Sequence, residues 1–348
     1  GQHWSPAIAA EALATRRDVA LFDETSFAKL EVSGPGAAQF LDRLCANRVD
    51  VPVGRIVYAS MLNPRGGIEA DLTVTRFAAD RFLIVTGTAF AQHDLGWLRK
   101  HLTDGDRATV QITDLTSGRV CYGLWGPRAR DVIAPLTTDD VSDAGFPYLT
   151  ARSITIGRVP VLALRVTYVG ELGWELYAHT EFGAALWDTL VDAGKAHGLT
   201  PAGYRAIDAL RLEKGYRVWS SDITPDENPY VAGLGFAVAL DKEREFIGRD
   251  ALVAAKAAGP SKRLRCLVLD DPRSVCLGNE PVRIGDDVVG RVTSGGYGYA
   301  VERSIAYAYL PPDAPIGTRG EIAVFGEWIG FEAVREPLWD PKNERVKA

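Results

Sequence analysis

The class of fold is decided by one stretch, Asn63-Pro64-Arg65-Gly66-Gly67-Ile68-Glu69-Ala70-Asp71-Leu72-Thr73-Val74-Thr75. It begins with turn residues and continues with strict alternation of apolar and polar side chains, which is typical of a β-strand. Working outward, we predict strands over residues 56–62, 68–75 and 81–85, separated by this turn and by a short turn at residues 79–80. The first third of the chain therefore contains a β-meander of at least three strands.

Helices and further strands flank the meander. The helical segments are residues 6–17, a segment that starts after Ser33 as N-cap, residues 181–196 ended by Gly198, and a segment from Pro201 to about Lys214 with Thr200 as N-cap. Further strands are predicted over residues 27–32, 119–125 and 159–167. This part of the chain therefore mixes helices with strands.

The last part of the chain has a different pattern. Residues 256–262, which include Gly259 and Pro260, are the best candidate for a linker. Beyond them we predict short strands over residues 265–269, 282–284, 288–292, 305–310 and 320–325, and we interpret Gly295-Gly296-Tyr297-Gly298 as a turn. This pattern predicts a small β-barrel. The fold class is α+β, with a first domain at residues 1–255 and a barrel domain at residues 262–345.

Composition excludes several classes of function. The 348 residues are 47% hydrophobic and 24% charged, and no apolar run approaches the roughly 20 residues of a membrane-spanning helix. The net charge is −6 and basic residues are scattered, so we expect neither a nucleic acid nor a membrane as partner. The four cysteines and five histidines show no metal-binding spacing, so we expect no metal, reduced thiols and a cytoplasmic location, or the mitochondrial matrix in a eukaryote.

Two carboxylates stand out as candidate functional groups. Asp71 lies in the middle of a predicted strand, where aspartate is unfavourable, and alternation places it with Thr73 on the polar face. Composition alone favours a solvent-facing polar stripe over a working carboxylate at this position. Glu175 lies in a predicted hairpin that turns at Gly170, on the same face as Tyr177. An ionised glutamate suits a planar edge with two donors, although an ordinary exposed glutamate explains the pattern more simply.

A third candidate is the helix after Pro201. Arg205, Asp208 and Arg211 are spaced three residues apart along one side of it. This spacing fits an intrahelical ladder of ion pairs as well as it fits a binding role.

Several ordered segments together resemble the aminomethyltransferase family, which comprises the T-protein of the glycine cleavage system and the folate-binding halves of dimethylglycine and sarcosine dehydrogenases or oxidases. The resemblance covers nearly the whole chain and rests on Leu21-Phe22-Asp23-Glu24-Thr25-Ser26-Phe27, Glu31-Val32-Ser33-Gly34-Pro35-Gly36, the strand after Gly66-Gly67, the hairpin from Tyr168 to Glu175, Leu210-Arg211-Leu212-Glu213-Lys214-Gly215-Tyr216-Arg217, Asp222-Ile223-Thr224-Pro225 and Phe246-Ile247-Gly248-Arg249. The segment from Leu210 to Arg217 is more similar to the dimethylglycine and sarcosine branch. Lys214-Gly215-Tyr216 lacks the cysteine of the related iron–sulfur maturation branch.

The resemblance implies a fold and a set of site residues. The fold is a three-lobed disc with tetrahydrofolate in its central hole and a C-terminal β-barrel as the third lobe. Asp71 matches the catalytic aspartate near folate N5 and N10, where a carboxylate can assist deprotonation of the amine and stabilise a cationic iminium. Glu175 matches the carboxylate that receives the amino and ring N–H donors of the pterin. The other cofactor-binding residues that the resemblance implies are Tyr58, Thr73, Gly87, Tyr168, Tyr177 and Arg211.

One position departs from the family pattern. Ile207 stands where glycine-cleavage members carry an arginine that is thought to meet the glutamate tail of folate. Arg205 and Arg211 are the candidates to replace it, and Arg205 lies about 200° around the helix from that position.

From this resemblance we predict a one-carbon transferase that captures a methylene unit, from formaldehyde or from an iminium derived from an N-methylamine, to give 5,10-methylenetetrahydrofolate. The oxidation that supplies this carbon needs a flavin, and the chain shows no dinucleotide fingerprint. The chain also opens at Gly1 with Met61 as its only methionine, so we expect that it was processed or cut from something longer. We therefore expect FAD only on a domain N-terminal to Gly1 or on a partner oxidoreductase subunit.

Two alternatives to this function stay open. One is a folate-dependent O- or S-demethylase that yields 5-methyltetrahydrofolate. The other is a non-catalytic folate-binding scaffold. For the transferase that captures a methylene unit, the expected partners are folate, a small methylamine and the FAD-dependent domain or subunit.

Overall fold

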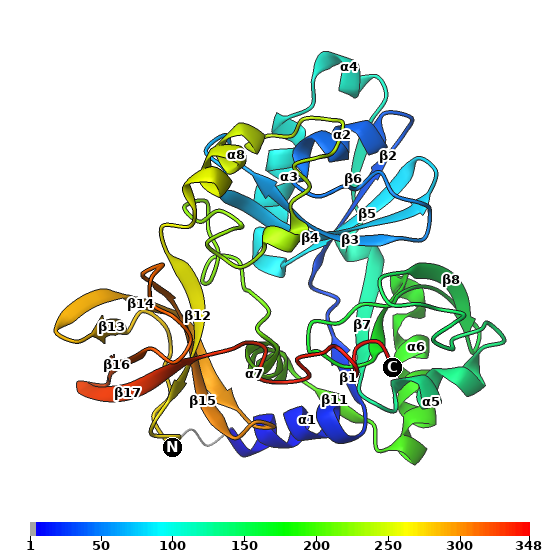
Figure 1. Cartoon of the computed structure of the whole chain (residues 1–348). Helices are drawn as coiled ribbons and strands as arrows, with labels where there is room; N and C mark the ends of the chain where they lie inside the picture. Colours follow the sequence, from blue (N-terminus) through cyan, green and yellow to red (C-terminus); the bar gives the residue numbers. More distant parts are fainter. Residues whose placement is uncertain (1–4) are drawn as a thin grey trace.

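The computed structural model describes residues 5–348, which form three lobes around a central helix, α7 (Tyr204–Lys214) (Figure 1). Two lobes are each built on an open β-sheet, and the third is a closed β-barrel. The predicted α+β class and the three-lobed architecture with a C-terminal barrel are therefore confirmed. Among the described residues, the structure contains no helix long and apolar enough to cross a membrane.

The first lobe, at the top of Figure 1, carries a five-stranded antiparallel sheet in the order β3-β4-β5-β2-β6. Its strands are β2 (Ala28–Ser33), β3 (Ile56–Leu62), β4 (Ile68–Ala78), β5 (Arg81–Thr86) and β6 (Gln111–Asp114), and its helices are α2 (Ala37–Leu44), α3 (Ala91–Lys100), α4 (Asp104–Arg107) and α8 (Arg249–Ala258). The predicted meander is confirmed as β3, β4 and β5. Ser33 does not cap α2, because it is the last residue of β2 and Gly36 holds the N-cap position.

The core of this lobe lies between the sheet and helices α2 and α3. Phe40 of α2 and Leu95 of α3 pack in one buried cluster with Leu72 and Val74 of β4. Because side chains alternate along a strand, this packing assigns the apolar face of β4 to the helices. Asp71 and its polar neighbours are therefore on the opposite face of the sheet.

The second lobe carries a six-stranded sheet in the order β11-β1-β7-β10-β9-β8, in which only the β1–β11 pair is parallel. Its strands are β1 (Ala20–Asp23), β7 (Arg119–Trp125), β8 (Ala151–Ile156), β9 (Val159–Leu164), β10 (Gly173–His179) and β11 (Thr200–Ala202), with helices α5 (Ala129–Ile133) and α6 (Gly183–Gly194) on one face. Thr200 is not the N-cap of the next helix, because residues 200–202 pair with β1 and α7 begins one turn later with Gly203 as N-cap.

The third lobe is a closed barrel in the strand order β12-β15-β14-β13-β16-β17. Its strands are β12 (Arg263–Leu269), β13 (Pro281–Ile284), β14 (Asp287–Gly298), β15 (Arg303–Leu310), β16 (Arg319–Val324) and β17 (Glu327–Val334). The turn predicted at residues 295–298 is wrong, since these residues are the end of β14 paired with β15. A Cβ on Gly296 would lie 2.8 Å from the Leu212 side chain, so glycine lets this strand pass close to α7. Helix α8 also extends to Ala258, into the predicted linker.

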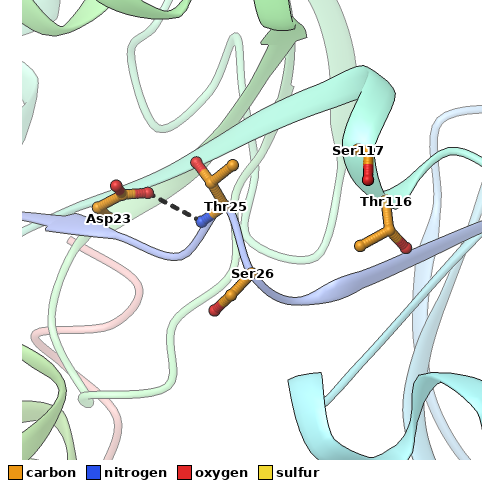
Figure 2. Close-up of a pocket in the computed structure, with 5 residues that line it drawn as sticks. All are labelled: Asp23, Thr25, Ser26, Thr116 and Ser117. Atoms are coloured by element: carbon orange, nitrogen blue, oxygen red, sulfur yellow. Dashed lines mark hydrogen bonds between the residues drawn. The ribbon is translucent and has the colours of Figure 1, made fainter.

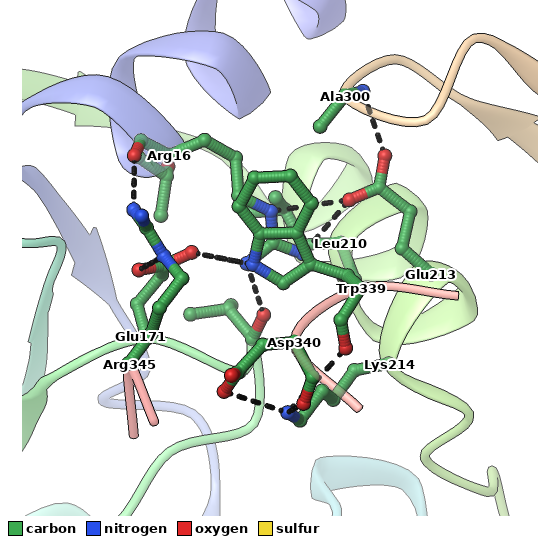
Figure 3. A network of polar contacts seen from close by, with 12 residues as sticks. Arg16, Glu171, Leu210, Glu213, Lys214, Ala300, Trp339, Asp340 and Arg345 are labelled. Carbon is green, nitrogen blue, oxygen red and sulfur yellow. Dashed lines mark hydrogen bonds and ion pairs between the residues drawn. The ribbon is translucent and has the colours of Figure 1, made fainter. Parts of the chain in front are cut away.

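Helix α7 is held between the lobes by a buried polar network (Figure 3). Arg16, from α1 (Ser5–Arg17), forms ion pairs with Glu171 at 2.9 Å and with Glu213 at 2.8 Å. Glu213 also accepts the backbone N–H of Ala300 in the barrel lobe at 2.8 Å. The C-terminal segment joins the network, because the indole of Trp339 donates to Glu171 at 2.8 Å. The network therefore connects α7 to α1, to the barrel lobe and to the C-terminal segment.

Candidate functional site

The polar face of β4 is directed at the second lobe and not at solvent. A buried cluster joins the two sheets and consists of Ile56, Leu83, Val85, Cys121, Ala151, Leu164, Val166 and Tyr177. Val85 pairs directly with Thr73, two residues from Asp71, so the cluster lies beside the polar face of β4. Thr75 on that face is completely buried. The expectation of a solvent-facing stripe, drawn from composition alone, is therefore wrong.

Asp71 lies on this face with one carboxylate oxygen unpaired. The residue opposite in the register is Ser60 of β3, and neither Asp71 Oδ1 nor Ser60 Oγ has a hydrogen-bond partner among the described residues. Burial raises the pKa of Asp71 from 3.8 to about 7, a hydrogen bond from Tyr58 partly offsets this, and the charge of Asp94 adds to it. A carboxyl group with a pKa near neutrality exchanges protons readily at neutral pH.

Two tyrosines lie near Asp71 from different lobes. Tyr58, in β3 opposite Thr73, stacks against the exposed ring of Phe236 with centroids 6.0 Å apart. Tyr168 follows β9 and donates its hydroxyl hydrogen to the backbone oxygen of Arg217 at 2.7 Å. After the dominant effect of burial, the charge of Asp71 raises the pKa of both tyrosines, so the three groups share one environment. The structure therefore brings Asp71, Tyr58 and Tyr168 together.

A histidine–aspartate pair next to Asp71 was not found from the sequence. Asp94 of α3 is buried and accepts a hydrogen bond from Thr86 Oγ1 at 2.7 Å. Its other oxygen lies 2.9 Å from His93 Nδ1, and the partly exposed His93 ring lies 5.4 Å from the Trp219 ring. Burial raises the pKa of Asp94, and hydrogen bonds from His93 and Thr86 act against this rise. His93 and Asp94 are neighbours in sequence, but only the fold places them at the end of β5 near Asp71, so no sequence motif marked them.

Glu175 occupies the facing sheet, in the middle of β10. It lies opposite Gly123 of β7, and Tyr177 lies opposite Cys121, so both project from the face that contributes to the cluster between the sheets. The Tyr177 hydroxyl donates to Glu175 Oε2 at 2.6 Å. Burial raises the pKa of Glu175 to about 7, and the hydrogen bond from Tyr177 lowers it. The structure therefore places Glu175 and Tyr177 as a hydrogen-bonded pair on the face that meets the first lobe.

Arg211 is already engaged in several contacts on α7. Its guanidinium contacts Asp208 at 2.8 Å and the buried Asp222 at 2.9 Å, and it donates to Ser294 Oγ at 3.1 Å. The ion-pair interpretation is thus confirmed for Asp208 and Arg211. A role of Arg211 in binding the tail of a ligand stays a prediction, and so does a role of Gly87, whose Cβ position faces the Phe90 ring at 3.1 Å.

An open pocket lies beside the start of β2 (Figure 2). It is lined by Asp23, Thr25, Ser26, Thr116 and Ser117, and none of the predicted site residues belongs to this lining. Its five small polar side chains include one carboxylate, which makes a hydrogen bond with the backbone N–H of Thr25 at 3.0 Å. The pocket is therefore separate from the face that carries Asp71.

Unpaired oxygens gather where the two sheets meet. Among the described residues, buried side-chain oxygens without a hydrogen-bond partner belong to Glu24, Ser60, Asp71 and Thr75, and to no other residue. Buried polar atoms are normally hydrogen-bonded, so this concentration of acceptors and hydroxyls fits a bound molecule rich in N–H donors. A reduced pterin, with amino and ring N–H groups, has that character. The residues present therefore fit tetrahydrofolate.

Comparisons with known proteins agree on one relationship. The GCVT N-terminal domain model matches residues 1–242, and the glycine cleavage T-protein C-terminal barrel domain model matches residues 262–340. The chain is 37% identical to mitochondrial dimethylglycine dehydrogenase of Rattus norvegicus, over 99% of this chain and 40% of that protein. It is 38% identical to 4-methylaminobutanoate oxidase (formaldehyde-forming) of Paenarthrobacter nicotinovorans, over 99% of this chain and 42% of that protein. The chain thus spans about two fifths of the length of these relatives.

A solved structure matches over nearly the full length of both chains. The glycine cleavage system aminomethyltransferase T from Bartonella henselae superimposes with a TM-score of 0.85 and 28% identity. The match covers 96% of this chain and 90% of that chain.

Proposed function

This chain belongs to the aminomethyltransferase family of the glycine cleavage T-protein, and on that premise we propose that it transfers a one-carbon unit to tetrahydrofolate bound between its first two lobes. One observation carries the proposal: Asp71, with a buried and unpaired carboxylate oxygen, lies on the sheet face that packs against the lobe of Glu175. The carboxylates come from strands more than 100 positions apart in the chain and share one region of the fold.

In this proposal Asp71 is the group that moves the proton. Forming a bond from a folate amine to carbon releases a proton, and a carboxyl group with a pKa of about 7 accepts it near neutral pH. When formaldehyde is the carbon source, the two N–H hydrogens of the folate leave with the aldehyde oxygen as water. When an iminium is the source, the amine leaves instead. Ionised Asp71 also stabilises positive charge next to the reacting carbon.

Glu175 orients the pterin in this proposal. Its carboxylate accepts the amino and ring N–H hydrogens, and Tyr177 holds one of its oxygens in place. Tyr58 and Tyr168 line the same region from the two sides, and the Phe236 ring stacked on Tyr58 adds an exposed aromatic surface. Thr73 lies between Tyr58 and Val85 in the register and contributes its hydroxyl to this face.

The source of the carbon is proposed from the relatives. Dimethylglycine dehydrogenase and 4-methylaminobutanoate oxidase (formaldehyde-forming) carry N-methylamines in their names, and this chain matches two fifths of each. We propose that the one-carbon unit comes from a small N-methylamine oxidised by an FAD-dependent domain or subunit. The flavin belongs to that domain or subunit.

The test combines binding with product identification. We expect tetrahydrofolate to bind in anaerobic titration calorimetry, and formaldehyde added to the complex to give 5,10-methylenetetrahydrofolate faster than the uncatalysed reaction. Asp71→Asn should slow this step about 100-fold or more, as expected for loss of a general base, with little change in affinity. Glu175→Ala should weaken binding by about 1.5–3 kcal/mol.

Asp80→Asn, at an exposed turn of the same lobe, is the matched control and should behave as the wild type. Binding without any product, unchanged by Asp71→Asn, would support a folate-binding scaffold instead. Formation of 5-methyltetrahydrofolate from a methyl donor would support a demethylase. Failure of the wild-type chain to bind tetrahydrofolate would refute the proposal.

A further inference from the structure

Glu24 is a buried glutamate that makes no hydrogen bond through its side chain. It follows β1, and its backbone N–H donates to the oxygen of Cys121 at 2.9 Å. The residue is only 1% exposed, and neither carboxylate oxygen has a hydrogen-bond partner among residues 5–348. Unpaired buried carboxyl groups are costly, so such a group indicates a contact that a ligand supplies.

Glu24 and Glu175 flank the same glycine. Glu175 lies directly opposite Gly123 in the β7–β10 register, while Phe22, two residues before Glu24, lies opposite Gly123 on the other side. A Cβ placed on Gly123 would lie 3.0 Å from Glu24 Oε2, so this position admits no side chain beside the carboxyl group. The two carboxyl groups therefore approach each other over the backbone of β7. Tyr177, on the same strand as Glu175, donates a hydrogen bond to the Glu175 carboxylate. No described residue donates a hydrogen bond to the Glu24 carboxyl group.

Two buried carboxyl groups beside the same strand oppose each other's ionisation. Burial raises the pKa of Glu24 well above its usual value, and the charge of Glu175 is the next largest cause of the rise. Like charges in a dry environment cannot both form easily, so one group keeps its proton when the other ionises. Tyr177 donates a hydrogen bond to Glu175, and no described residue donates one to Glu24, so Glu175 is the member that ionises and Glu24 is the member that keeps its proton. The titratable groups around the pair are Asp23 at the end of β1, Lys29 on β2, Cys121 on β7, Tyr177 on β10, Tyr204 on α7 and Tyr148 before β8.

The neighbouring groups do not remove this asymmetry. Lys29 is the only cation among them, and its ammonium group already donates to the backbone oxygens of Thr25 at 2.8 Å and Phe27 at 2.7 Å. Burial raises the pKa of the Cys121 thiol and of Tyr177 well above their usual values, so both stay neutral. The charge state of the pair is therefore set mainly by the two glutamates.

We propose that Glu24 and Glu175 carry one proton in total, on Glu24, and bind the 2-amino-pyrimidinone ring of the pterin from two sides. This inference rests on the proposed function and names the residues that select its ligand. Glu175, as a carboxylate, accepts the N–H hydrogens of the amino group and of the adjacent ring nitrogen. Glu24, as a neutral carboxyl group, donates to the unprotonated ring nitrogen N1 and accepts an N–H next to it.

The chemistry of the ring explains why one proton is needed. One side of the ring presents two donors, which match an ionised carboxylate with its two acceptors. The other side presents an acceptor beside a donor, which matches a protonated carboxyl group. An amide has the same donor-and-acceptor pattern as the neutral acid. We therefore expect glutamine to preserve binding of the ring at position 24 and to weaken it at position 175.

The experiment measures affinity for 5-formyltetrahydrofolate, a reduced folate that resists oxidation, by titration calorimetry between pH 6 and pH 9.5. We expect Glu24→Gln to bind within about threefold of the wild type at pH 7, and Glu24→Leu and Glu175→Gln to bind about tenfold more weakly or worse. Wild-type affinity should fall toward the alkaline end as Glu24 loses its proton. Affinity of Glu24→Gln should persist there, because an amide does not titrate.

Glu181→Gln, at an exposed glutamate of the same lobe, is the matched control and should follow the wild-type profile. Thermal melts of each variant separate lost binding from lost folding, and the nearly isosteric Glu24→Gln keeps the test informative if Glu24→Leu unfolds. Wild-type affinity in both Glu24 variants at every pH would overturn the inference and leave the proposed function intact. A wild-type chain that binds neither 5-formyltetrahydrofolate nor tetrahydrofolate would instead refute the proposed function.

Discussion

Replacing the proposed catalytic aspartate should stabilise the folded chain, and increasingly so as the pH rises. The pKa of Asp71 is about 7 in the fold against 3.8 for an ordinary aspartate, mainly because of burial. The folded state therefore binds this proton more tightly than the unfolded chain does. Stability is favoured by protonation and falls as the pH rises through the window between about 4 and 7. Asparagine does not titrate, so Asp71→Asn removes this loss.

The magnitude follows from the difference in pKa. About 3 pH units at 1.36 kcal/mol per unit give an upper bound of about 4 kcal/mol above pH 7. Because Asp71 is partly accessible to solvent, we expect about 2–4 kcal/mol. At pH 5 only about a third of this loss of stability has occurred, because pH 5 lies about a third of the way from pKa 3.8 to pKa 7. The gain in stability of Asp71→Asn should therefore be about 1–3 kcal/mol larger at pH 8 than at pH 5.

The assay is urea unfolding of the wild type and Asp71→Asn at pH 5, 6, 7 and 8, followed by tryptophan fluorescence. Asp80→Asn serves again as control, because this aspartate lies at an exposed turn of the same lobe. A stability difference for Asp71→Asn that is constant or shrinks as the pH rises would refute the reasoning. It would mean that the carboxyl group ionises in the fold at its ordinary pKa.

Two further predictions concern the surroundings of the site. Arg16→Gln leaves the buried carboxylate of Glu213 without its guanidinium partner and leaves Glu171 paired with Arg345 alone, so the free energy of unfolding should fall by about 3–5 kcal/mol in urea titrations at pH 7. A loss below 1 kcal/mol would show that the network in Figure 3 contributes little to stability. Asp94→Asn removes a negative charge that raises the pKa of Asp71, so the acid limb of the pH–rate profile should move to lower pH. An unchanged or alkaline-shifted limb would contradict the proposed coupling of the two aspartates.

The segment from Leu210 to Arg217 carried much of the family resemblance, yet its charged side chains hold the lobes together. Glu213 pairs with Arg16 and the barrel backbone, and Lys214 contacts Asp340 of the C-terminal segment at 3.0 Å. This family motif therefore forms a structural junction between the lobes. These polar contacts act together with apolar packing, because Ile207 and Leu210 of α7 lie in a buried cluster with Trp125 of the second lobe.

Local sequence determined the elements whose signal is local. Alternation predicted β4, and strand-forming residues between turn signals predicted β3 and β5, all with nearly correct ends. The same rule placed Asp71 and Thr73 on one face and Glu175 and Tyr177 on another. Local helix-start signals were wrong at residues 200–202, because this segment pairs with β1 as a strand.

Only the tertiary structure decided what those faces meet. Alternation cannot tell solvent from a second sheet, since both permit polar side chains, and composition then favoured an exposed stripe for Asp71. The approach of Asp94 to Asp71 and of Glu24 to Glu175 arises from contacts between elements that are separated in the chain. Burial between lobes is also what raises the pKa values of these carboxyl groups, and burial is a property of the assembled fold.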